Sequence, residues 1–277
     1  MNLVTEPTLN NSLKPHPADV GKYLYAIMSG NECRAYDVKG IDGNPAYSVT
    51  NGRVAAVISD CSRQRIRPER SHLAAHKDVL QRLMLEQTVL PMAFGIIADH
   101  AEGIRSLLDL NQKTFLTQLN RVEGKVEMGL RVVWDVPNIF EYFLDIHPKL
   151  RLVRDRLIGT SREPRQEDKI ELGQLFDHLL NEDRETHIEQ IQEVLAPCCV
   201  EIKRSQPRNV NEVANLNCLV EREAQKQLED AVFQAAGLFD NNFAFDFNGP
   251  WAPHNFVEIQ LELPPRKRGL KLNVVGR

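Results

Sequence analysis

Two histidines four residues apart, His72 and His76, come closest to a catalytic motif by type and spacing. On a helix they would share one face and could hold a metal ion. The zinc-hydrolase pattern needs Glu directly after the first histidine as general base, and Leu73 stands there instead. We therefore expect both histidines at the edge of an amphipathic helix, and we keep a metal-dependent hydrolase using His72 and His76 as an alternative.

No other set of residues completes a catalytic centre. The sequence has no Gly-rich phosphate loop, no G-x-S-x-G nucleophile elbow and no C-x-x-C pair. The Asp-His neighbours at 99–100 and 177–178 are adjacent in sequence, which alone makes no acid/base pair. Cys198 and Cys199 adjoin on an expected strand, where their thiols would point to opposite faces. We expect no enzymatic activity, no catalytic residues, no cofactor and no metal.

The composition is that of an ordinary globular chain. Its 277 residues suggest two domains, since a domain has ~100–200 residues. The net charge of −4 lacks the basic excess of a dedicated nucleic-acid binder. Five irregularly spaced cysteines favour a reducing cytoplasm over a disulfide framework. No run approaches the ~18 apolar residues that a membrane-spanning helix needs, so we expect no membrane partner.

The first half of the chain predicts one compact α+β domain at residues 21–136, after a disordered polar arm at residues 1–20. The strand at 122–134 is the clearest element, because apolar residues occupy every second position. The other predicted elements are a strand at 23–28, a hairpin around Asn51-Gly52 with a type I′ turn, a helix at 71–87 and a strand at 89–98.

The second half predicts another α+β domain at residues 137–263, followed by a flexible basic tail at 264–277. A helical segment comes first and strands return after it. The expected helices are 139–157, 166–195 and 221–238, and the expected strands are 198–202, 213–220, 243–247 and 257–263. Helices on one face of antiparallel strands in both halves give the fold class α+β with two α/β sandwiches.

One aromatic segment near the C-terminus, GPWAPHNF at residues 249–256, stands apart from the predicted elements. Two prolines stiffen it and place Trp251 and Phe256 in a loop. These two rings either fill the space beside the second sheet or form a rigid patch for a partner, since aromatic residues dominate interface hot spots. Both interpretations stay open.

Three segments together resemble the gas vesicle protein F/L family, with the F branch closer than the L branch. They are YLYAI at 23–27, TVLPMAFG at 88–95 and GPWAPHNF at 249–256, and their order and spacing fit as well. The sequence departs from the family pattern at Ala93, Ala252 and His254. The residues that carry the family motifs are Tyr25, Leu90, Pro91, Phe94, Gly95, Gly249, Pro250, Trp251, Asn255 and Phe256.

The resemblance implies an accessory protein of gas vesicle formation that is not an enzyme. It implies a ferredoxin-like N-terminal domain and a second α+β domain. It also implies that the chain assists or binds the hydrophobic shell subunit and other accessory gas vesicle proteins, in the cytoplasm or at the vesicle. Because ferredoxin-like sheets can bind RNA through exposed aromatics, a single-stranded RNA-binding protein is the second alternative, although the RNP1 pattern is not found.

The partner-binding hypothesis rests on the aromatic segment and on one basic cluster. An apolar shell subunit would aggregate in water unless a binder covers it. Such a basic cluster is ordinarily a solvated loop. Otherwise it could bind an acidic surface or phosphate. The hypothetical contact residues are Pro250, Trp251, Phe256, Arg63, Arg65, Arg67 and Arg70.

Overall fold

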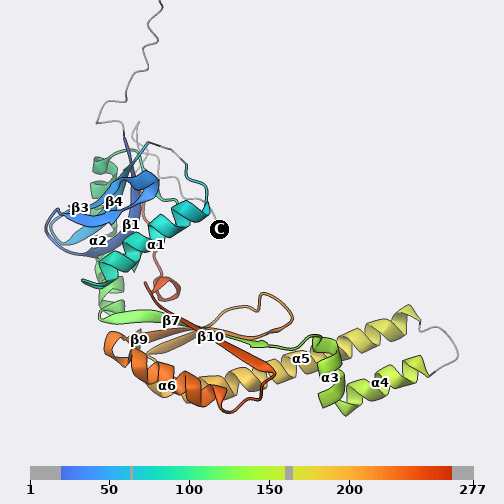
Figure 1. Ribbon diagram of the computed structural model, residues 1–277. Helices are drawn as coiled ribbons and strands as arrows, with labels where there is room; N and C mark the ends of the chain where they lie inside the picture. Colours follow the sequence, from blue (N-terminus) through green and yellow to red (C-terminus); the bar gives the residue numbers. More distant parts are fainter. Residues whose placement is uncertain (1–19, 63–64, 160–164, 264–277) are drawn as a thin grey trace, which may run out of the picture. The chain divides into compact units, whose positions relative to one another are not determined.

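The protein consists of two compact units in a computed structural model that describes residues 20–62, 65–159 and 165–263 (Figure 1). Of the described residues, those up to Arg121 and those from Glu258 onward form unit 1, and those from Val122 to Val257 form unit 2. Each unit has its own antiparallel sheet and its own helices, which confirms the α+β fold class. The predicted arm up to residue 19, the predicted tail at 264–277 and Arg63 lie outside the described residues.

The sheet of unit 1 is built around β1 (Gly21–Ser29), in which Tyr23 to Met28 are all buried. The strand order is β2-β3-β4-β1-β5, and β6 also pairs with β1. The other strands are β2 (Ala35–Lys39), β3 (Pro45–Thr50), β4 (Val54–Cys61), β5 (Leu90–Pro91) and β6 (Ile97–Ala98), and the helices are α1 (Arg70–Met84) and α2 (Ala101–Val122). Helix α1 forms as expected because its buried residues recur at steps of three and four.

The turn between β3 and β4 confirms the hairpin but not its predicted type. Gly52 has a φ of +94°, whereas Asn51 is not among the described residues with positive φ. The Asn51 side chain instead accepts hydrogen bonds from the backbone N–H groups of Arg53 (3.3 Å) and Val54 (3.2 Å). A type I′ turn needs positive φ at both central residues, so the side-chain bonds replace that geometry here.

Unit 2 contains β7 (Lys125–Trp134), β8 (Glu201–Arg204), β9 (Glu212–Glu221) and β10 (Phe243–Trp251) in the order β10-β7-β9-β8. All three neighbouring pairs are antiparallel. Helices α3 (Ile139–Ile146), α4 (Pro148–Ile158) and α5 (Gln166–Leu195) connect β7 to β8, and α6 (Gln225–Ala236) connects β9 to β10. This is the β-α-β-β-α-β order of a ferredoxin-like unit, with three helices in the first crossover.

The predicted boundary at Pro137 is wrong, and so is the assignment of β7 to the first half. Strand β7 pairs with β9 on one side and β10 on the other, so the second unit begins at Val122. The alternation of apolar and polar residues in β7 indicated a strand. It did not indicate which strands pair with β7, because pairing involves residues far away in the sequence. The ferredoxin-like order therefore belongs to unit 2, while in unit 1 no described helix of the α type separates β1 from β4.

The two faces of the second sheet differ in character. Trp134 and Phe243 face α5, where their rings lie 6.3 Å and 5.1 Å from the His187 ring, and Figure 1 shows α5 and α6 on the same side of the sheet. Alternate residues point the other way. That second face, here called the open face, carries Glu127, Gly129, Arg131, Asn215, Asn217, Leu219, Lys203, Ala244, Asp246 and Asn248.

The segment after Val257 is not the strand that its alternating apolar residues predicted. It returns to unit 1 as an extended segment along α2. The buried Asn111 side chain donates to the Glu262 carbonyl (2.9 Å) and accepts from the Glu262 N–H (2.8 Å). A side chain thus satisfies the backbone groups that a neighbouring strand would otherwise pair.

Candidate partner-binding surface

The aromatic segment begins at an irregularity where β10 leaves regular pairing. The register of β10 against β7 shifts between Asn248 and Trp251, and Trp251 is aligned with Glu127. Gly249 has a φ of +130°, and a Cβ there would lie 2.8 Å from the Met128 sulfur. Only glycine suits this backbone. The turn directs the segment across the open face.

A buried carboxylate holds the segment in place. Glu127 is 5% exposed, and its two oxygens accept the Asn255 backbone N–H (2.9 Å) and the Asn255 side-chain amide (2.6 Å). Lys203 donates to the Asn255 carbonyl at 2.9 Å. Burial raises the pKa of Glu127, although the Asn255 donors and the Lys203 charge act against that rise. The Asn255 of the family motif is therefore a structural clamp.

The two aromatic residues of the segment have different environments. Phe256 is fully buried, with the Lys203 ammonium 5.5 Å from its ring centre, so it packs in unit 2 and is removed from the hypothetical contact set. Trp251 is half-buried on the open face, and its indole N–H donates to Asn248 Oδ1 at 2.7 Å. Pro250 beside it is exposed. Trp251 and Pro250 are the residues that a partner can reach.

The basic cluster lies in the other unit. Arg65 and Arg67 precede α1, Arg70 is its first residue, and all three side chains are exposed. Ile66 between them is buried and anchors the loop. These arginines belong to unit 1 and Trp251 belongs to unit 2, and we treat the two as separate surfaces.

The other family-motif residues hold unit 1 together. Tyr23 Oη accepts the Gly95 N–H at 3.0 Å, and Tyr25 Oη accepts the Ile41 N–H at 2.7 Å. Leu90 and Pro91 are the whole of β5 and pair with β1. Phe94 lies 6.0 Å from the Tyr23 ring in an edge contact. The YLYAI and VLPMAFG motifs are therefore one packing unit.

The two histidines of α1 have separate structural roles. His76 Nδ1 lies 2.9 Å from Tyr23 Oη, inside the aromatic packing of unit 1. His72 Nδ1 lies 3.0 Å from the Arg67 carbonyl oxygen, and its Nε2 lies 3.4 Å from the Asp42 carboxylate. Among the described residues, no group of three or more His, Cys, Asp or Glu side chains is placed to hold a metal ion.

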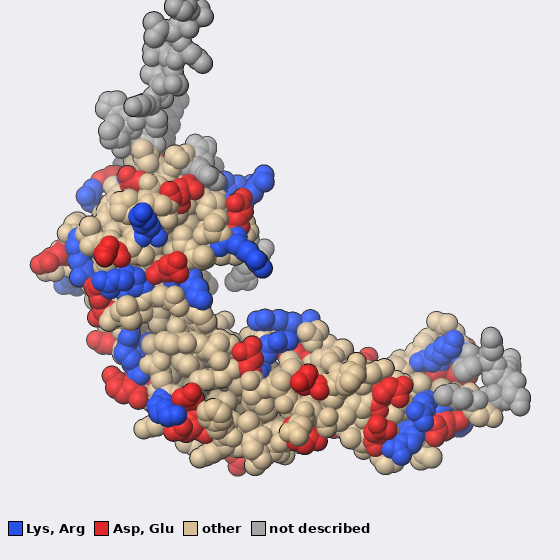
Figure 2. Space-filling model, in the orientation of Figure 1, with Lys and Arg blue, Asp and Glu red and all other residues tan. Residues whose placement is uncertain are grey.

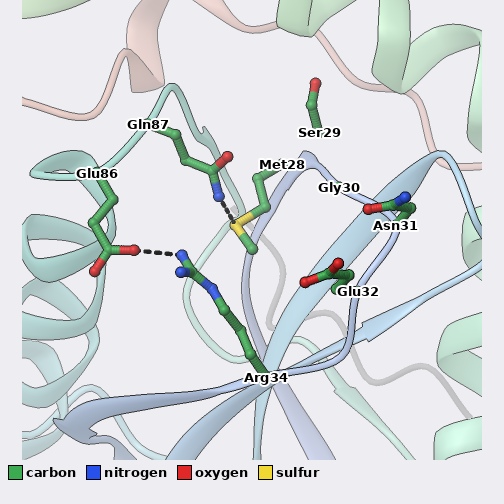
Figure 3. Close-up of a pocket in the computed structure, with 8 residues that line it drawn as sticks. All are labelled: Met28, Ser29, Gly30, Asn31, Glu32, Arg34, Glu86 and Gln87. Carbon is green, nitrogen blue, oxygen red and sulfur yellow. Dashed lines mark hydrogen bonds and ion pairs between the residues drawn. The ribbon is translucent and has the colours of Figure 1, made fainter.

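A polar pocket of about 350 Å³ lies in unit 1, between the end of β1, the loop after it and the residues after α1 (Figure 3). Figure 3 shows Arg34 and Glu86 reaching toward each other as an ion pair, with Gln87 directed at the Met28 sulfur. Its described lining contains no histidine, cysteine or lysine. The polar side chains of the lining, among them Ser29 and Glu32, can form hydrogen bonds with a small polar molecule.

Comparison with known proteins gives a consistent match over most of the chain. The family model of the gas vesicle synthesis protein GvpL/GvpF matches residues 21–258. The chain belongs to this family. It is 25% identical to gas vesicle protein F of Dolichospermum flosaquae over 86% of this chain and 97% of that protein, and 27% identical to that of a Streptomyces species over 85% and 99%.

Solved structures agree on the fold. The crystal structure of GvpF from Anabaena matches with a TM-score of 0.73 at 22% identity, covering 90% of this chain and all of that one. The structure from Microcystis aeruginosa matches with the same score at 23% identity, covering 87% of this chain and all of the other. This GvpL/GvpF family member is thus a gas vesicle protein, and no helix in its described part is long and apolar enough to cross a membrane.

The sequence did not indicate two residues of this surface, Glu127 and Asn248. Glu127 occupies a polar position of an alternating strand, which usually means exposure to solvent. Its burial depends on a loop more than 120 residues later in the chain. The nearest available signal was the asparagine of the GPWAPHNF motif, whose side chain needs a partner if the loop covers it.

Proposed function

We propose that this protein is a non-enzymatic accessory protein of gas vesicle assembly that binds the hydrophobic shell subunit. Its contact surface is the open face of the second sheet, with Trp251 and Pro250 at its centre. Family membership supports the gas vesicle role, and the fixed, accessible Trp251 supports the contact. The setting we propose is the cytoplasm, with attachment to the vesicle during assembly.

The single observation that carries the proposal is how Trp251 is held. Its backbone follows a turn that requires Gly249, and Glu127 clamps the chain four residues later. A large aromatic side chain on a rigid backbone loses little conformational freedom when it binds. Such residues are frequent interface anchors. Trp251 would cover apolar surface of a shell subunit at this contact.

The exposed arginines of unit 1 fit a second, polar contact. Arg65, Arg67 and Arg70 present positive charge next to the start of α1. We assign them to an acidic surface on the shell subunit or on another accessory gas vesicle protein. Exposed ion pairs mainly change association rates, so we expect salt to weaken this contact more than the Trp251 contact.

The RNA-binding alternative receives less support from the sheet. RNA-binding ferredoxin-like sheets stack bases on aromatic side chains of their exposed strands. On the open face of unit 2, the described strands carry amide, charged and aliphatic side chains, and Trp251 is the one aromatic residue. Asp246 is aligned with Arg131 on this face, so this pair adds no basic excess that would attract phosphate.

The test is co-purification of the shell subunit from cells that express both proteins. Trp251→Ala should reduce the captured subunit, since loss of a hot-spot residue costs about 2 kcal/mol or more. The matched control is Phe233→Ala, which removes a 70% exposed aromatic ring from the helix side of the same unit. Phe256→Ala should instead destabilise the fold by about 3–5 kcal/mol. Equal capture by Trp251→Ala and wild type would refute the proposed surface.

A further inference from the structure

Strand β10 is the least protected sheet edge in the described part of the protein. The opposite edge, β8, has only four residues, and three of them are charged. In unit 1, β2 has five residues with Asp37 and Lys39, while β5 and β6 have two residues each. Natural sheets usually shorten or charge their edges to prevent unwanted pairing. Over its nine residues, β10 carries one charge, Asp246.

Backbone groups of β10 are directed away from the sheet. Asp135 donates its N–H to the Asn242 carbonyl at 2.7 Å, whereas Trp134 donates to Asn211 on the β9 side at 2.9 Å. Hydrogen-bonding direction alternates along an antiparallel pair. Since Phe245 is aligned with Val132, two residues before Trp134, the N–H and C=O groups of Phe245 and Phe247 face the outer edge.

An apolar strip follows the same edge. Phe243, Phe245 and Phe247 are only half-buried although they face the helix layer. The Phe239 ring extends the strip, at 4.8 Å from Phe243 and 5.5 Å from Phe245, and Leu238 is 63% exposed. Figure 2 shows few charged side chains over this part of unit 2, where the end of α6 and β10 lie (Figure 1).

We propose that the outer edge of β10 pairs with an extended segment of the shell subunit, which adds a fifth strand to the sheet of unit 2. The added strand would place apolar side chains on the phenylalanine strip at every second position. Its main chain would pair with the outward N–H and C=O groups of Phe245 and Phe247. This inference rests on the proposed function and extends it from the Trp251 surface to the strand that leads into it.

Three features select this occupant. The strip requires alternating apolar residues, which a hydrophobic subunit can supply in an extended segment. Asp246 on the open face favours a basic residue opposite it. The edge is also continuous with the proposed contact surface, because β10 ends at Trp251. Pro250 has no N–H to offer, so pairing should stop before it.

The test uses two substitutions at one position, Phe247→Ala and Phe247→Pro. Both remove the ring, but only proline removes the outward N–H, and it leaves the bonds of neighbouring residues to β7 in place. Each variant is co-expressed with the shell subunit and the co-purified subunit is measured. We expect Phe247→Pro to capture about fivefold less than Phe247→Ala, as the loss of a backbone hydrogen bond predicts. Thermal unfolding of the two purified variants checks that their folds are equally stable.

The outcomes separate this inference from the proposed function. If wild type captures the subunit and the two variants capture it equally, edge pairing is refuted while the proposed function stands. If wild type captures none, both fail. If the purified protein alone forms a dimer that Phe247→Pro dissolves, and subunit capture is unaffected, the edge belongs to a second copy and the inference is wrong.

Discussion

At the scale of single residues, glycines show how the site depends on local backbone geometry. Gly249 has a φ of +130° and no room for a Cβ, while Gly173 in α5 has open space around it. We predict that Gly249→Ala lowers the free energy of unfolding by about 1–3 kcal/mol. Gly173→Ala should raise it by about 0.5–1 kcal/mol, because alanine favours a helix interior. Chemical denaturation measures both, and a neutral Gly249→Ala would contradict the geometry described for this turn.

The buried Glu127 predicts a pH dependence of stability. Its pKa is raised by burial above the ordinary 4.5, so ionisation costs more in the folded than in the unfolded protein. The stabilising contribution of the neutral carboxyl is fully present below pH 4.5 and is lost as pH rises through the raised pKa. Glu127→Gln cannot titrate. The stability of wild type relative to Glu127→Gln should therefore fall as pH increases from 4 to neutral, as measured by urea unfolding at each pH.

A pH-independent difference between these two proteins would mean that Glu127 titrates alike in the folded and unfolded states. The prediction is specific to residue 127, because the comparison subtracts the titration of every other group. Asn255→Ala provides the matched control. It removes the side-chain amide that donates to Glu127, and this hydrogen bond is one of those that oppose the rise in the Glu127 pKa.

At the scale of elements, the sequence predicted most helices and strands because each has a local cause. The stripe of α1 and the alternation of β7 appear within the elements themselves. The same rule misled at residues 257–263, where apolar residues alternate but the structure has no strand. Alternation predicts an extended backbone, but a partner strand is needed to make it part of a sheet.

The candidate site was partly predictable for the same reason. The GPWAPHNF motif pointed to Trp251 because aromatic and proline residues adjoin in the sequence. Which ring is buried could not be predicted, since Phe256 is covered through contacts with Lys203 in β8 and a segment held by Glu127 in β7. The edge position of β10 was likewise hidden until the strand order was known.

At the scale of the whole molecule, the chain leaves unit 1 at Arg121 and returns to it at Glu258. This return makes unit 1 depend on the C-terminal segment. We predict that truncation after Val257 destabilises unit 1 by about 1–3 kcal/mol, because the buried Asn111 loses its Glu262 partners. Truncation after Leu263 is the control, since it keeps those partners.

Tryptophan fluorescence and hydrogen exchange can report on the two units separately. Both tryptophans, Trp134 and Trp251, lie in unit 2. Truncation after Val257 should therefore leave the tryptophan fluorescence transition unchanged while hydrogen exchange in α2 becomes faster. A shift of the fluorescence transition instead would show that unit 2 also depends on the C-terminal segment.

The most direct test of the account is the amount of hydrophobic shell subunit that stays soluble and co-purifies when wild-type protein is co-expressed with it. Covered apolar surface does not aggregate, so the account predicts a defined soluble complex and little subunit in the pellet. A well-folded wild-type protein that leaves the subunit insoluble and captures none of it would contradict the proposed role and the surface assigned to it.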